Sequence, residues 1–303
     1  RRPPRSTPLY SSAASDVYKR QGFRPISEKD LFDCEYWSLE QAKLGKGAPP
    51  KFQGKVVMIT GGSGTIGFAI AEAFSKLGAQ TILVDKDEIA LKESVAKLGV
   101  GHKYFPIDVT HSDAANQAML AAINNFGGLD ILISNAGAAH AGPMLGISNE
   151  ELRNAFELNF FSHYSFSTEA AKILKDQNRG GQILFNISKQ AVNPGKNFGA
   201  YGLPKATTFF LMRQLALELG SDGIRVNGIN ADRIRSGLLT DDFISSRAKS
   251  RGVSESEYMA GNLLNKEVTA EHVADAFTAL ACAESTTGHV MTVDGGNIEA
   301  SLR

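Results

Sequence analysis

The stretch ITGGSGTIG, residues 59–67, is rich in glycine and lies between two apolar segments. It closes an apolar run of strand length at 56–59 and opens a segment of helical periodicity at 67–77. Glycines at such a strand-to-helix turn let the backbone turn tightly and approach a pyrophosphate, which rests on the helix N-terminus. We therefore expect a dinucleotide-binding turn, whose cofactor contacts are Gly61, Ser63, Gly64, Thr65, Ile66 and Gly67.

From residue 54 onward, apolar runs of strand length alternate with longer amphipathic segments. This alternation is typical of an α/β fold. It predicts a Rossmann-type doubly wound parallel sheet of seven strands with helices on both faces. The expected strands are 56–59, 81–84, 103–107, 131–134, 182–186, 224–229 and 290–293, and helical patterns include 67–77, 111–125, 149–175, 201–219 and 270–281.

Acidic residues follow the second and third expected strands. Asp85 lies 24 residues beyond Gly61, where a carboxylate can accept hydrogen bonds from a ribose 2′-hydroxyl and would repel a 2′-phosphate. This favours NAD over NADP, although Lys86 is a dissenting feature. Asp108, followed by Val109, either holds the adenine edge of the cofactor or neighbours a helix N-cap.

Polar groups follow the fourth and fifth expected strands, at the sheet edge where ligands of such folds bind. The small residues Asn135-Ala136-Gly137 would let a cofactor lie against the backbone. Ser188 ends the fifth strand, and Tyr201 and Lys205 stand one helical turn apart, so they share a helix face. Pro204 between them predicts that the pair lies in the first turn of its helix. A phenol beside an ammonium can act as an acid–base pair.

Composition excludes several kinds of partner. The chain has 32 basic and 32 acidic residues, which gives no electrostatic footprint for nucleic acid or an anionic membrane. No apolar run approaches the roughly 18 residues that a membrane helix needs. The two cysteines, Cys34 and Cys282, are too few and too far apart for a disulfide framework or a metal knuckle. We expect reduced thiols, a cytoplasmic location and no metal site.

The N-terminal residues differ in character from the rest. Residues 1–21 contain DVYKRQ, which resembles a translated sequencing adapter, so we expect a disordered artefact there. Residues 22–53 are polar, carry one helical pattern at 36–44 and end in a Gly/Pro hinge, as an interdomain connector does. The globular domain is expected at 54–303.

Four motifs in order resemble the short-chain dehydrogenase/reductase family: TGGSGTIG at 60–67, NAG at 135–137, a serine before YxxxK, and VDGG at 293–296. The resemblance implies an NAD-binding oxidoreductase of small molecules. Tyr201 would be the general acid/base, with its pKa lowered by Lys205 and by the oxidised nicotinamide. Lys205 would also bind the nicotinamide ribose, Ser188 the substrate oxygen, and Asn159 a proton-relaying water. The same resemblance adds Tyr201, Ile234 and Ser236 to the cofactor contacts.

The sequence departs from the family pattern at several points, one of which indicates another function. The spacing TGxxGxxG is that of the extended branch of the family, which includes epimerases and dehydratases, whereas the other motifs match the common branch. Ala231-Asp232 stands where the family usually has Pro-Gly after the sixth strand. A third possibility is a relative that binds dinucleotide without turnover, but such proteins typically lose the Tyr–Lys pair.

The segment EKDLFDCEYWSLEQAKLG, residues 28–45, resembles bifunctional proteins in which a rhamnulose-1-phosphate-type class II aldolase precedes the dehydrogenase. This suggests an aldolase domain upstream in the native gene. It also suggests a small hydroxylated substrate, such as lactaldehyde or a sugar-derived polyol. The segment 236–265 would be a lid over this substrate, and Arg235 would contact it. The resemblance further implies a homodimer or homotetramer assembled through 149–175 and 201–219.

Overall fold

The computed structural model describes residues 27, 28, 30, 31, 49–139, 141–237 and 239–297. The chain divides into two units, Arg1–Pro49 and Pro50–Arg303. The expected artefact at 1–21, the helical pattern at 36–44 and Cys34 lie outside the described residues. Phe52 already packs within the second unit, with its ring centroid 4.9 Å from that of Phe74.

The second unit contains a seven-stranded parallel sheet with the strand order β3-β2-β1-β4-β5-β6-β7. This confirms the expected fold class. The strands are β1 (Val56–Thr60), β2 (Gln80–Asp85), β3 (Lys103–Pro106), β4 (Ile131–Ser134), β5 (Gly181–Asn186), β6 (Ile224–Ala231) and β7 (Val290–Val293).

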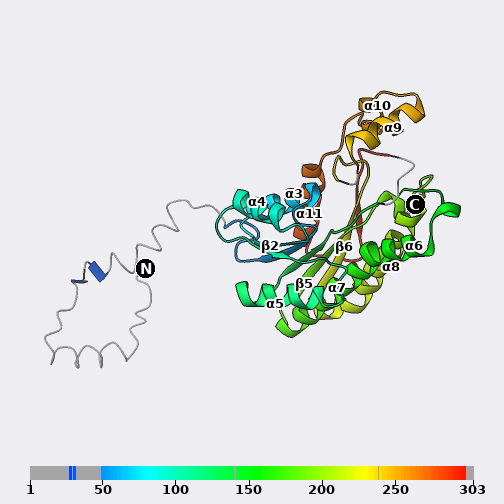
Figure 1. Cartoon of the computed structure of the whole chain (residues 1–303). Coiled ribbons are helices and arrows are strands. Elements are labelled where there is room, and N and C mark those ends of the chain that lie inside the picture. Colours follow the sequence, from blue (N-terminus) through cyan, green and yellow to red (C-terminus); the bar gives the residue numbers. More distant parts are fainter. Residues whose placement is uncertain (1–26, 29, 32–48, 140, 238, 298–303) are drawn as a thin grey trace. The chain divides into compact units, whose positions relative to one another are not determined.

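Helices cover both faces of the sheet (Figure 1). The helices α3, α4 and α11 pack on one face, whereas α5, α7 and α8 pack on the other. Two further helices, α9 and α10, lie side by side beyond the sheet. The helices are α3 (Thr65–Lys76), α4 (Glu88–Leu98), α5 (Ala114–Phe126), α6 (Asn149–Phe156), α7 (Ser162–Gln177), α8 (Gly199–Leu219), α9 (Asp241–Arg251), α10 (Glu255–Met259) and α11 (Ala270–Cys282).

Strand β1 shows why the strands read as continuous apolar runs. Val57 and Ile59 belong to the core beneath α3 and α11, whereas Met58 belongs to the core on the opposite face. All three side chains are fully buried. A parallel sheet covered on both faces needs apolar residues at every position, not at alternate ones.

The chain reverses its direction of travel across the sheet between β1 and β4. It runs outward from β1 to β3 and then returns to place β4 on the other side of β1. Such a switch point leaves a crevice outside the carboxyl ends of the two strands, where ligands of open α/β sheets bind. The candidate site lies at this edge.

Three helix predictions differ from the structure. Helix α8 begins at Gly199, because the N–H groups of Tyr201 and Gly202 already bond to the Phe198 carbonyl. Pro204 therefore lies in the second turn, not the first as the sequence predicted. The expected helix 149–175 contains a π-helical turn at Glu157–Phe161. Helix α4 was not among the expected helical patterns.

Candidate active site

One cavity of about 1090 Å³ is lined by residues at or after the carboxyl ends of six of the seven strands. Its wall contains the glycine-rich turn after β1, the acids after β2 and β3, the NAG residues after β4, and the segments after β5 and β6. Residues of α8 and α9 complete it. The cavity is therefore continuous from the glycine-rich turn to the helices beyond the sheet.

The glycine-rich turn forms a cradle that side chains would fill. Gly61 has φ +64, and a Cβ there would lie 3.0 Å from the Ala136 Cα. A Cβ on Gly67 would collide with the Gly61 carbonyl oxygen. Because both glycines keep this surface as bare backbone at the start of α3, the turn fits a pyrophosphate group. Gly61, Gly64, Thr65, Ile66 and Gly67 all lie on the cavity wall.

Asp85 is tied to the glycine-rich turn. Its Oδ2 accepts a hydrogen bond from the Ser63 backbone N–H at 3.3 Å, and its Oδ1 accepts one from the Lys86 N–H at 2.8 Å. Asp85 lines the cavity, whereas Ser63 does not. Ser63 thus positions the carboxylate and offers no direct contact with the cavity. Lys86 also lies on the wall.

Asp108 and Val109 line the same part of the cavity. The Asp108 carboxylate accepts hydrogen bonds from the Thr110 backbone N–H at 2.9 Å and from the Thr110 hydroxyl at 2.7 Å. These bonds lower the pKa of Asp108 below its ordinary value, despite an opposing effect of partial burial. Asp113, not Asp108, is the N-cap residue of α5. The Asp108 carboxylate therefore stabilises the turn at residues 108–110 at the cavity wall.

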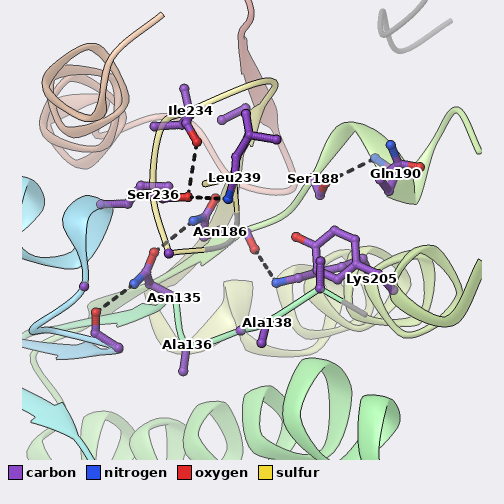
Figure 2. Close-up of a pocket in the computed structure, with 18 of the residues that line it drawn as sticks. Asn135, Ala136, Ala138, Asn186, Ser188, Gln190, Lys205, Ile234, Ser236 and Leu239 are labelled. Atoms are coloured by element: carbon purple, nitrogen blue, oxygen red, sulfur yellow. Dashed lines mark hydrogen bonds between the residues drawn. The ribbon is translucent and has the colours of Figure 1, made fainter. Parts of the chain in front are cut away.

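A network of amides holds the floor of the site (Figure 2). The Thr60 hydroxyl accepts the N–H groups of Asn135 and Ala136, at 2.9 and 3.1 Å. The Asn135 side-chain NH₂ donates to the Thr60 carbonyl at 2.9 Å, and its oxygen accepts from the Asn186 side chain at 2.8 Å. The network fixes the chain after β4 against β1 and β5. Asn135, Ala136 and Gly137 thereby form a flat wall beside the glycine-rich turn.

Ser188 and Tyr201 face the cavity from opposite ends of one loop. The Ser188 hydroxyl oxygen accepts the Gln190 N–H at 3.2 Å (Figure 2). Burial raises the pKa of Tyr201 above its ordinary value, and a hydrogen bond with Ser188 opposes this. The protein by itself therefore does not produce the lowered Tyr201 pKa expected from the sequence. Loss of water around the phenolate outweighs the hydrogen bond from Ser188.

Lys205 is buried beside Tyr201, with its Nζ 5.9 Å from the centroid of the Tyr201 ring. Its Nζ donates to the Asn186 carbonyl at 3.0 Å and lies 3.3 Å from His163 Nε2. Burial lowers the pKa of Lys205 to about 7. Burial thus disfavours the charged form of Lys205 in the protein without cofactor.

Asn159 lies in the π-helical turn and does not line the cavity. Its side-chain NH₂ donates to the carbonyls of Ala138 at 2.9 Å and Ala155 at 3.1 Å. Its Oδ1 is buried and has no hydrogen-bond partner among the described residues. A Cβ on Gly137 would meet this oxygen at 2.9 Å, so the glycine leaves space beside it. An orphaned acceptor of this kind fits an ordered water, as the family resemblance implies.

The segment after β6 bends over the cavity. Ile234 and Ser236 lie on the wall, and the Ser236 hydroxyl donates to the Ile234 carbonyl at 3.1 Å (Figure 2). Arg235 does not line the cavity, contrary to the expected substrate contact. Its guanidinium is held by Glu267 at 2.7 Å and Asp241 at 2.6 Å. Two acidic partners on neighbouring segments therefore direct it away from the site.

Three further residues of the site, Thr60, Asn186 and His163, were not predicted from the sequence. Thr60 begins the TGG motif, and Asn186 immediately precedes Ile187-Ser188. Their closeness to these motifs could have identified them as residues of the site. His163 lies four residues after Asn159, which places it one helical turn along. Its pKa is lowered well below the ordinary value by burial and by the Lys205 charge. It is therefore a neutral imidazole inside the site.

The comparisons with known proteins agree with this arrangement. The family model described as enoyl-(acyl carrier protein) reductase matches residues 62–297. The chain belongs to the short-chain dehydrogenase/reductase family. A second model, described as the second domain of class II aldolase, matches residues 11–44.

Among relatives of this short-chain dehydrogenase/reductase is an uncharacterised oxidoreductase, YuxG, of Bacillus subtilis (strain 168). It is 34% identical over 289 residues, which cover 90% of this chain and 42% of YuxG. The chain thus spans less than half the length of that relative.

Two solved structures share the fold. L-sorbose reductase from Gluconobacter frateurii, complexed with NADPH and L-sorbose, has a TM-score of 0.75 and 28% identity, covering 82% of this chain and 98% of the other. A 3-ketoacyl-(acyl-carrier-protein) reductase from Brucella melitensis, complexed with NADH, has a TM-score of 0.72 and 25% identity, covering 80% and 98%.

Within the described part of the chain, no helix has the length and apolar character needed to span a membrane. The same residues contain no group of three or more His, Cys, Asp or Glu side chains that could hold a metal ion.

Proposed function

We propose that this short-chain dehydrogenase/reductase is an NAD-dependent enzyme that interconverts an alcohol and a carbonyl on a small hydroxylated substrate. The observation that carries the proposal is the meeting of Ser188, Tyr201 and Lys205 in one cavity with the glycine-rich turn. A non-catalytic dinucleotide-binding protein has no use for a buried phenol beside a buried ammonium. Buried ionisable groups that are poised together are costly to keep and cluster at catalytic sites.

The chemistry divides between cofactor and protein. The nicotinamide, when bound, accepts or supplies the hydride. The Tyr201 hydroxyl gives or takes the proton on the substrate oxygen, while the Ser188 hydroxyl donates a hydrogen bond to that oxygen. Lys205 bonds the cofactor ribose and places its positive charge near the phenolate. Because burial raises the Tyr201 pKa in the protein alone, the positive charge of the oxidised cofactor is needed to bring this pKa down.

The cofactor preference rests on Asp85. Its carboxylate lies on the cavity wall at the carboxyl end of β2, held by the Ser63 and Lys86 backbone N–H groups. A negative charge at this point accepts hydrogen bonds from a ribose 2′-hydroxyl and repels a 2′-phosphate. Lys86 works against this preference but projects from an exposed position. NAD is therefore the proposed cofactor, and NADP the weaker substrate.

The proposed substrate is a small hydroxylated aldehyde or a sugar-derived alcohol. The match of residues 11–44 to a class II aldolase domain supports this, because such aldolases release small hydroxylated carbonyl fragments. Lactaldehyde is the fragment expected from a rhamnulose-1-phosphate-type aldolase. The L-sorbose named in the Gluconobacter structure is likewise a polyhydroxylated carbonyl compound.

A second copy of the chain is the proposed partner. Large apolar side chains are exposed along α7 and α8, including Tyr164, Leu203, Phe210 and Leu217, whose exposed fractions range from 46% to 81%. A face of this kind is costly in water unless another chain covers it. We expect a dimer or tetramer by light scattering, and dissociation when Phe210 and Leu217 are both replaced by Asp.

The experiment that tests the function is a turnover assay with NAD⁺ and a panel of lactaldehyde, short polyols, 2-hydroxy acids and one long apolar alcohol. We expect formation of reduced cofactor with one or more of the small hydroxylated compounds and none in the Tyr201→Phe variant. Preference for the apolar alcohol would contradict the substrate class. Activity that survives in Tyr201→Phe would contradict the mechanism.

A further inference from the structure

Aromatic and basic side chains line the end of the cavity that lies away from the glycine-rich turn. The rings of Phe198, Phe243 and Tyr258 lie there, together with Arg247 and Arg251 of α9. Phe198 is the N-cap residue of α8, so this end begins three residues before Tyr201. Whatever occupies it is adjacent to the reacting group.

Arg247 is held by two rings. Its guanidinium carbon lies 5.3 Å from the centroid of Phe198 and 5.6 Å from that of Phe243. The two rings meet edge to face, with centroids 5.8 Å apart and planes at 82°. A guanidinium stacked in this way has lost most of its freedom before any ligand arrives. Arg247 is therefore pre-organised.

One hydrogen-bond donor of Arg247 has no partner among the described residues. This donor is its Nε, which is buried. Buried donors without partners are rare in folded proteins and cost about 1–3 kcal/mol each. The planar guanidinium of an arginine can pair with the two oxygens of a carboxylate or phosphate.

The basic residues around Arg247 also favour an anionic ligand. On this part of the wall, Lys189 and Arg233 share the carboxylate of Asp232, each at 3.4 Å. Arg247, Arg251 and Lys196 also line the cavity, and no ion pair holds them within the part of the chain that the structure describes. Arg251 lies one helical turn beyond Arg247, so both face the same side of α9. Three basic side chains thus line one cavity without an ion-pair partner among the described residues.

We propose that Arg247, supported by Arg251 and Lys196, binds a carboxylate or phosphate group on the substrate. This inference deepens the proposed function and rests on it for the identity of the reacting group. Among small hydroxylated substrates, it favours 2-hydroxy acids and phosphorylated sugar alcohols over uncharged lactaldehyde or free polyols. The aromatic walls would cover the short carbon chain between the anionic group and the carbon that reacts at Tyr201.

Binding can be measured without turnover, by isothermal titration calorimetry on the full chain at saturating NADH, because an alcohol cannot pass hydride to a cofactor that is already reduced. Bound NADH blocks the phosphate-binding turn, so an added anion reports on the other end of the cavity. The probes are two matched pairs: lactate with its uncharged amide, and glycerol 3-phosphate with glycerol. We expect at least one anion to bind roughly tenfold or more tightly than its uncharged counterpart, and the better pair to identify carboxylate or phosphate as the preferred group.

Variants of Arg247 assign the effect to this side chain. Arg247→Met should weaken binding of the anion roughly tenfold and leave the uncharged counterpart unaffected, whereas Arg247→Lys should keep part of the affinity. Arg213→Met is the matched control, because Arg213 stacks on Phe209 at 5.6 Å but lies outside the cavity wall. This control should behave as the unsubstituted protein does.

Three results would overturn the inference: equal affinity for both members of each pair, no binding of either anion, or an Arg247→Met effect no larger than that of Arg213→Met. These are separable from failure of the proposed function. Arg247-dependent anion binding without oxidation of any alcohol would leave the anion site standing and remove the oxidoreductase activity. Oxidation of uncharged substrates alone, with no anion binding, would remove the anion site and leave the oxidoreductase activity standing.

Discussion

Lys205 Nζ lies 3.3 Å from His163 Nε2, in a pocket where both side chains are almost completely buried. An ammonium group can only donate, so Nε2 is the acceptor and the neutral imidazole carries its proton on Nδ1. That nitrogen lies 2.6 Å from the Ser134 hydroxyl, which can accept this proton. With the Asn186 carbonyl as the second acceptor, one N–H of Lys205 remains for a cofactor ribose.

Replacing His163 with Leu should impair cofactor binding and turnover. The change removes one of two acceptors that aim Lys205, and a buried donor left unpaired costs about 1–3 kcal/mol. We expect kcat/KM to fall by roughly tenfold and its dependence on pH to shift, both measured with NAD⁺ as the varied substrate. His163→Gln, which keeps an acceptor, should recover most of the loss. If both variants lose only thermal stability and keep the wild-type pH profile, His163 merely fills the core.

Tyr201→Phe should lower kcat by roughly 10²–10⁴-fold, the usual contribution of a general acid/base. Binding of NAD⁺, followed by fluorescence or calorimetry, should change little, because the ring remains in place. Lys205→Met should weaken both turnover and cofactor binding, since it removes the ribose contact as well. A Tyr201→Phe variant that retains several per cent of activity would assign the proton transfer to another group.

Asp85→Ser should raise tolerance for NADP⁺. Removal of the carboxylate relieves repulsion of the 2′-phosphate, and we expect kcat/KM for NADP⁺ to rise roughly tenfold while that for NAD⁺ falls. Lys86→Gln is the companion variant: loss of this nearby cation should lower kcat/KM for NADP⁺ relative to the unsubstituted enzyme. Equal efficiency with both cofactors in the unsubstituted enzyme would reject the role given to Asp85.

Stability of the cofactor-free protein should rise with pH above neutrality because of Lys205. Its pKa is about 7 in the folded protein and near 10.5 when exposed, so in this window the unfolded chain binds a proton that the folded chain does not. Unfolding then becomes less favourable with increasing pH, by at most about 1.4 kcal/mol per pH unit. His163 contributes to the pH dependence of stability only at pH values below its ordinary pKa of 6.5, which lie outside this window. Denaturant titrations across the window should show the rise, and Lys205→Met should remove it. A wild-type protein whose stability is flat there would contradict the uncharged state of Lys205.

The sequence could predict the sheet and most of the cavity wall because both depend on local pattern. Strands buried on both faces must be apolar throughout, so β1 and β4 were recognisable as short runs. Parallel strands bring their carboxyl ends to one edge, so Asp85, Asn135 and Ser188 could be placed together from their positions after strands. Helix α4 was missed since much of its surface is exposed and its apolar pattern is weak.

The tertiary structure decided what each polar side chain does. Two arginines illustrate this, since Arg235 and Arg247 are both basic residues near the predicted lid. Neighbouring carboxylates neutralise Arg235 outside the cavity, whereas two rings fix Arg247 within it. Likewise, the lowered pKa of Lys205 follows from its burial, and no feature of YxxxK reports burial. Local periodicity specifies backbone and strand ends, but charge state and partners depend on atoms that are distant in sequence and are set when the chain packs.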